Sequence, residues 1–194
     1  SGRFDTSTKF GQNNRTGFFP AASLPCRVSQ EDFLKDVKQI SDLKLRVSYG
    51  LTGNDDISPF LFSELYGNGS YGGQPAIYPS NIPNPDLKWE STAQLNIGFN
   101  LGLFDDRVVL TADYYNKQTD GLLFSVPLPG SAGATSINQN TGSLESKGIE
   151  LILNAEVLAR NRFSWNTSFN LAKNDQRWLR DNGKYHLPSI SVLK

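Results

Sequence analysis

Side chains able to do chemistry are few in this 194-residue chain. It holds one histidine, His186, and one cysteine, Cys26. A lone cysteine forms no internal disulfide, and no Cys or His cluster has the spacing of metal ligands. Asp105-Asp106 is typical of a turn. Glu150 and Glu156 share a strand face but lie about 20 Å apart at ~3.3 Å per residue. The sequence therefore predicts no catalytic site, no metal and no cofactor.

One long loop contains better candidates for binding. Asn54-Asp55-Asp56 offers oxygen ligands of the kind that calcium accepts, but no full ligand series follows, which favours a solvated polar turn. Tyr66, Tyr71 and Tyr78 are spaced through a glycine-rich stretch. Aromatic anchors among Gly and Asn form adaptable contact surfaces. We therefore treat these tyrosines as candidate contacts to a sugar ring or to a protein partner, with loop packing as the alternative.

Strict alternation of apolar and polar residues predicts the strands. From Ala93 to Leu103 every odd position is apolar and every even one is polar or glycine, and only a strand places such a set on one face. Pro25 interrupts another alternating stretch, which predicts a bulge or a sheet edge there. The segment 31–41 alone has helical spacing, so one short helix is expected. The other alternating stretches are 18–28, 43–52, 108–117, 144–158 and 163–171.

Strand length and loop order favour a membrane. Membrane-spanning strands need about 9–11 residues, whereas strands of soluble domains have roughly five or six. The long loops 53–86 and 125–142 alternate with short turns, as in outer-membrane barrels. We therefore predict an all-β fold, the antiparallel up-and-down strands of a partial transmembrane β-barrel. Its polar face would line the lumen with Lys44, Arg46, Asn96, Asn100, Asp113 and Lys117.

Composition leaves one competing class open. The 19 basic and 19 acidic residues cancel, which argues against a nucleic-acid partner. No apolar run approaches the ~18 residues of a transmembrane helix. A polar, glycine-rich chain that is 11% aromatic suits a barrel, but it also suits a secreted β-sandwich. A soluble or secreted β-sheet carbohydrate-binding module therefore remains the alternative.

Five strings, in order, resemble SusC/RagA-type TonB-dependent outer-membrane transporters. The resemblance covers roughly residues 3–175, and it departs at Pro25-Cys26, where the family usually has Ala-Trp. The strings are GFFPAASL (17–24), SDLKLRVSYGLTGN (41–54), NPDLKWE (84–90), DYYNK followed by TD and LL (113–123), and NTG followed by KGIEL (140–151).

The resemblance implies the C-terminal part of a barrel of about 22 strands in the bacterial outer membrane. Such proteins are not enzymes. They import glycans, peptides or other large nutrients, energised through TonB, with a SusD-like surface lipoprotein as a lid. We accordingly divide the chain into a partial barrel, 1–175, and an irregular tail, 176–194. About six strands are fewer than the roughly eight of the smallest closed barrels, so we expect one piece of a larger chain. A non-functional remnant of a transporter gene is the other possibility.

Overall fold

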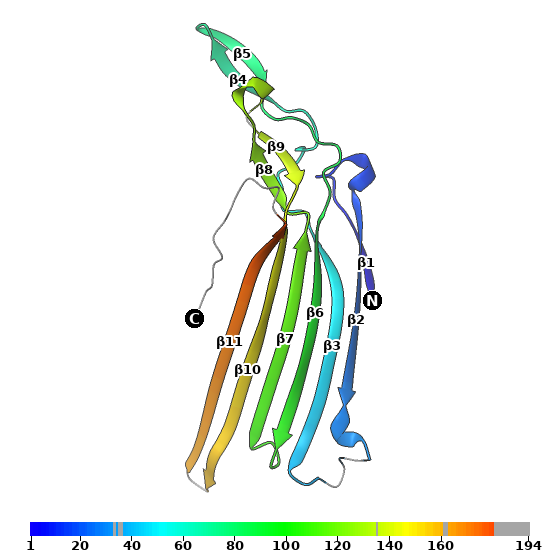
Figure 1. Ribbon diagram of the computed structural model, residues 1–194, viewed down its shortest axis with the longest axis vertical. Helices are drawn as coiled ribbons and strands as arrows, with labels where there is room; N and C mark the ends of the chain where they lie inside the picture. The colour runs from blue at the N-terminus through cyan, green and yellow to red at the C-terminus, as the bar shows by residue number, and fades with distance from the viewer. Residues whose placement is uncertain (33, 35–36, 135, 161–162, 181–194) are drawn as a thin grey trace.

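The chain folds into one long antiparallel sheet (Figure 1). The computed structural model describes residues 1–32, 34, 37–134, 136–160 and 163–180. We call this sheet the wall. Its strands pair in the order β1-β2-β3-β6-β7-β10-β11, so the predicted all-β, up-and-down class is confirmed. These strands are β1 (Gly2–Thr6), β2 (Thr16–Arg27), β3 (Ile40–Asn54), β6 (Glu90–Leu103), β7 (Val108–Asp120), β10 (Ser143–Arg160) and β11 (Phe163–Arg180).

Both long connections carry hairpins of their own. β4 (Tyr66–Tyr71) pairs with β5 (Gln74–Pro79), and β8 (Leu123–Pro127) pairs with β9 (Ser136–Asn140). They stand together at one end of the sheet, and the β6–β7 turn lies at the other (Figure 1). The expected sorting of long and short connections is therefore present. The long connections were wrongly expected to be plain loops. Gly72 and Gly73, both with positive φ, make the tight β4–β5 turn.

The expected helix at 31–41 is absent from the residues described there. The N–H groups of Leu34, Val37 and Ile40 donate to the carbonyls of Glu31, Leu34 and Val37, at 3.0–3.1 Å. Each bond spans three residues, so the described residues of this segment form turns. Residues 33, 35 and 36 lie outside the described residues. The prediction failed because a helix this short has little stability of its own, and this segment has to connect β2 to β3.

Within the described ranges the helical pieces are three short 3₁₀ turns. They are η1 (Gln12–Asn14), η2 (Val28–Gln30) and η3 (Gly130–Ala132). No helix in the described ranges is long and apolar enough to cross a membrane.

Pro25 lies in regular pairing. It opposes Arg46 in an unbroken register between β2 and β3, so the bulge alternative is wrong. β1 pairs only with residues 16–20 of β2, so at Pro25 the strand has a described neighbour on one side alone. Proline, which lacks an N–H donor, is tolerated at such an edge.

β11 continues beyond the stretch that alternates. It pairs Gln176 with Ser146 and Trp178 with Leu144, so residues 176–180 are strand and were wrongly expected to be irregular. The pattern fades because the face that carries Leu171 continues as Lys173, Asp175 and Arg177, so that both faces become polar. Residues 161–162 and 181–194 lie outside the described residues.

The register separates the side chains into two faces. One row crosses five strands as Leu45, Phe99, Ala112, Leu151 and Leu171. Leu45 is 43% exposed and Leu171 is 54% exposed. The only buried hydrophobic side chains within the described ranges are Phe10, Phe19 and Leu87, and none of them covers this apolar face. No second layer of described residues packs on it, and an exposed apolar sheet face of this kind is what the predicted membrane-spanning wall requires.

The apolar face gives a direct test. Phe99→Arg is expected to lower the free energy of unfolding in lipid vesicles by about 2–4 kcal/mol, the range for a charge near the bilayer midplane. Asn100→Arg is the matched control, because it lies at the same depth on the opposite face, and it should have a much smaller effect. Denaturant titration followed by tryptophan fluorescence measures both. Equal destabilisation by the two variants would contradict a lipid-facing role for Phe99.

Candidate functional site

The six residues predicted to face the lumen share the polar face of the sheet. Lys44 opposes Asn100, Arg46 and Asp113 both oppose Gly98, and Asn96 lies between Ser48 and Tyr115. Lys117 opposes Gln94. They come from β3, β6 and β7, the centre of the wall. The structure therefore places all six on one continuous surface, opposite the apolar face.

An ion pair crosses the central strand of this surface. Arg46 Nη2 lies 2.9 Å from Asp113 Oδ1 and 3.2 Å from Oδ2. The two residues belong to β3 and β7, with Gly98 of β6 between them. A Cβ at position 98 would lie only 2.0 Å from Asp113 Oδ1. The carboxylate thus occupies the space that a side chain on β6 would need, and the pair depends on that glycine.

The neighbouring polar groups form hydrogen bonds along the wall. Asn96 donates through Nδ2 to Ser48 Oγ at 3.2 Å and accepts from Gln94 Nε2 at 2.9 Å. The Oδ1 atom of Asn100 is buried without a hydrogen-bond partner among the described residues. Lys44 Nζ lies 4.0 Å from Asp42. This surface offers polar contacts to whatever fills the space beside it.

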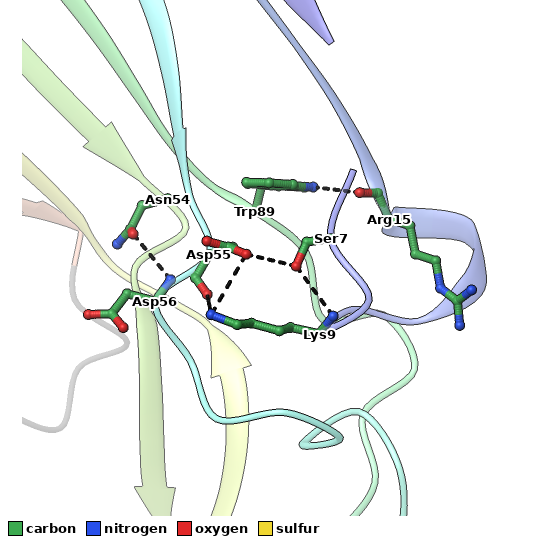
Figure 2. Close-up of polar contacts among 7 residues, drawn as sticks. All are labelled: Ser7, Lys9, Arg15, Asn54, Asp55, Asp56 and Trp89. Atoms are coloured by element: carbon green, nitrogen blue, oxygen red, sulfur yellow. Dashed lines mark hydrogen bonds and ion pairs between the residues drawn. The ribbon is translucent and has the colours of Figure 1, made fainter. Parts of the chain in front are cut away.

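A second cluster lies at the base of the long loops, and the sequence identified only its residues 54–56 (Figure 2). Ser7 Oγ donates to Asp55 Oδ2 at 2.7 Å. Lys9 Nζ donates to the Asp55 carbonyl at 2.9 Å and lies 3.8 Å from the Asp55 carboxylate. Asn54 Oδ1 accepts from the N–H of Asp56 at 3.1 Å. Asp55 therefore ties the polar turn at 54–56 to the 7–15 loop. No three Cys, His, Asp or Glu side chains in the described ranges are placed to hold a metal ion.

An aromatic core underlies this cluster. Phe10 and Leu87 are fully buried, and the Trp89 ring centroid lies 5.3 Å from that of Phe10 and 5.6 Å from that of Phe19. Trp89 Nε1 also donates to the Arg15 carbonyl at 3.2 Å (Figure 2). The 7–15 loop, the segment before β6 and strand β2 thus meet at this end of the wall. The aromatic residues were visible in the sequence, but their long sequence separation gave no sign that they meet.

The three candidate tyrosines all lie on the β4–β5 hairpin and do not form one cluster. Tyr66 is 61% exposed, Tyr71 is 85% and Tyr78 is 49%. Tyr78 opposes Gly67 in the hairpin register, so it lies on the face opposite Tyr66. The nearby Glu64 carboxylate accepts a hydrogen bond from the Tyr66 hydroxyl and repels its ionised form, which raises the pKa of Tyr66 above its ordinary value.

A double-mutant cycle tests the Arg46–Asp113 pair. Arg46→Gln and Asp113→Asn should show a coupling free energy of about 0.2–1 kcal/mol, because both side chains are part-exposed and water screens such pairs. Repeating the cycle in a Gly98→Ala background should reduce the coupling toward zero, because the new Cβ displaces the carboxylate. Unfolding free energies in vesicles provide the readout. Undiminished coupling in the Gly98→Ala background would refute the dependence on glycine.

Known proteins resemble this chain in sequence and in fold. A profile of the TonB dependent receptor-like, beta-barrel family matches residues 1–193. TonB-dependent receptor P39 of Formosa agariphila is 42% identical over 178 residues, which are 91% of this chain and 17% of that protein. TonB-dependent receptor SusC of Bacteroides thetaiotaomicron is 38% identical over 181 residues, 89% of this chain and 18% of that protein.

A solved structure, that of the RagAB peptide transporter, matches with a TM-score of 0.86 and 31% identity, over 96% of this chain and 21% of the other. The chain therefore spans less than a fifth of these two curated relatives. The profile match, the relatives and the shared wall lead to one conclusion: this chain belongs to the TonB-dependent receptor β-barrel family, as the five strings indicated.

Proposed function

We propose that the chain forms part of the barrel wall of a SusC-like outer-membrane importer for large nutrients, either oligosaccharides or peptides. TonB would energise the importer, and a SusD-like surface lipoprotein would work with it. The observation that carries this proposal is the single-layered sheet with one apolar, exposed face and one polar face. Its five longest strands, β3, β6, β7, β10 and β11, have 13–18 residues, enough to cross a bilayer.

Each face then has its own role. The apolar face contacts outer-membrane lipid. The six polar-face residues line the lumen: Lys44, Arg46, Asn96, Asn100, Asp113 and Lys117. The β4–β5 and β8–β9 hairpins lie outside the cell, where Tyr66, Tyr71 and Tyr78 meet substrate or lipoprotein. TonB-dependent transporters are not enzymes, and we propose no catalysis or cofactor for this chain.

One competing interpretation, a soluble module, fits the observations less well. A soluble carbohydrate-binding module needs a second layer over Leu45, Phe99 and Leu171, and the described residues provide none. RagAB, whose wall matches this one, is a peptide transporter, which favours import over an isolated sheet. Measuring transport distinguishes a working importer from a non-functional remnant of a transporter gene.

Uptake tests the proposal. A bacterium that produces the receptor containing this chain should take up labelled oligosaccharides or peptides in a TonB-dependent way. Loss of either the receptor or TonB should abolish that uptake, and restoring the missing gene should return it. Uptake that is unchanged without the receptor would contradict the import function.

Thiol labelling tests the assignment of the two faces. Asn96→Cys and Ile97→Cys, each in a Cys26→Ser background, place a thiol on neighbouring residues of opposite faces. In membranes, a small charged thiol reagent should modify Asn96→Cys much faster, because Ile97 faces hydrocarbon, where a charged reagent does not partition. Mass spectrometry measures both rates. Faster modification at position 97 would reverse the assignment of lumen and lipid.

A further inference from the structure

The β4–β5 hairpin holds one aromatic ring flat against its backbone. A Cβ on Gly67 would lie 3.1 Å from Tyr78 Cζ, and a Cβ on Gly69 would lie 2.8 Å from Tyr78 Cε1. Both glycines are on the same face of β4 as the ring. The ring therefore fills the space that two side chains would occupy, and it lies along the strand instead of standing out from it.

The outer side of this ring is open. Tyr78 is 49% exposed although its inner side rests on β4. Tyr71 lies on the same face, is 85% exposed and opposes Gln74 in the register. A flat ring, a phenol hydroxyl and an amide thus share one surface, which we name the Tyr78 platform (Tyr71, Gln74 and Tyr78).

The base of the hairpin is fixed before any ligand binds. Asn81 is 5% exposed, accepts a hydrogen bond from the N–H of Leu65 at 2.7 Å and donates to the Ser63 carbonyl at 3.0 Å. Ser80 N–H donates to the Leu65 carbonyl at 2.8 Å. A surface held in this way is already ordered, so binding loses less conformational entropy.

The platform is also uncharged. No Asp, Glu, Lys or Arg occurs between Glu64 and Asp86. A peptide brings charged termini and often charged side chains, and this surface offers them no partner. The C–H-rich face of a neutral sugar ring matches a flat aromatic ring, and its hydroxyls match an amide and a phenol.

We propose that the Tyr78 platform binds neutral oligosaccharides, with a hexopyranose ring stacked on Tyr78 and its hydroxyls hydrogen-bonded to Gln74 and Tyr71. This inference rests on the proposed import function and deepens it, because it selects oligosaccharides over peptides. Gly67 and Gly69 serve as positioning residues, since they let the ring lie flat.

Binding to the purified receptor that contains this chain tests the platform. The probes are hexasaccharides of glucose, galactose and mannose, with hexaproline as a peptide whose rings can also stack. Tyr78→Ala should weaken binding of at least one hexasaccharide about threefold to tenfold, as expected for loss of one stacking contact. Tyr78→Phe should keep the affinity. Ile77→Ala is the matched control, because Ile77 is 74% exposed on the opposite face.

Gly69→Ala supplies a test that removes no contacting atom. The new Cβ forces the ring to tilt, so the affinity should fall as it does in Tyr78→Ala. Equal affinities of wild type and Tyr78→Ala, tighter binding of hexaproline, or no binding of any hexasaccharide would overturn the platform. If TonB-dependent uptake persists in that case, the importer proposal stands without it. Absence of receptor-dependent uptake would instead remove the importer proposal itself.

Discussion

Hydrogen bonding between neighbouring strands determines the rest of this wall. Hydrocarbon offers no water to backbone N–H and C=O groups, so each strand that crosses a bilayer has to satisfy them with its neighbours. Long, in-register antiparallel pairing does this, and it also fixes which side chains share a face. Leu45, Phe99 and Leu171 then lie together on one side, and Arg46 and Asp113 lie together on the other. A shift of one residue would exchange the two faces.

The same constraint explains what alternation in the sequence could predict. Alternation predicted β6 and β7 because one face of these strands is apolar and the other is polar, so successive positions differ in polarity. Alternation could not predict the part of β11 beyond Leu171. Lys173 and Asp175 lie on the same face as Leu171 but are charged, so the contrast between the two faces is lost there. The turns after Gln30 resembled a helix because Leu34 and Val37 have helical spacing, although the connection needs turns there.

Contacts between distant loops lay beyond the sequence for a different reason. Phe10, Phe19 and Trp89 belong to three segments, and no periodicity relates them. The six polar-face residues could be assigned to one face by parity alone, but parity does not show that Arg46 reaches Asp113 across a strand. That contact depends on Gly98, whose importance appears only once the register is known.

Glycine opposite a large side chain recurs in this structure and has different consequences in different places. At Gly98 the Asp113 carboxylate fills the vacant position, and at Gly148 a Cβ would lie 2.7 Å from Tyr115 Oη. In the wall, such pairs bring large side chains close to the backbone of the neighbouring strand. In β4 the same packing holds the Tyr78 ring flat with its outer side open. The packing is the same in both places, and only its location in the fold differs. A glycine that opposes a large residue therefore indicates that the large side chain lies flat along the sheet.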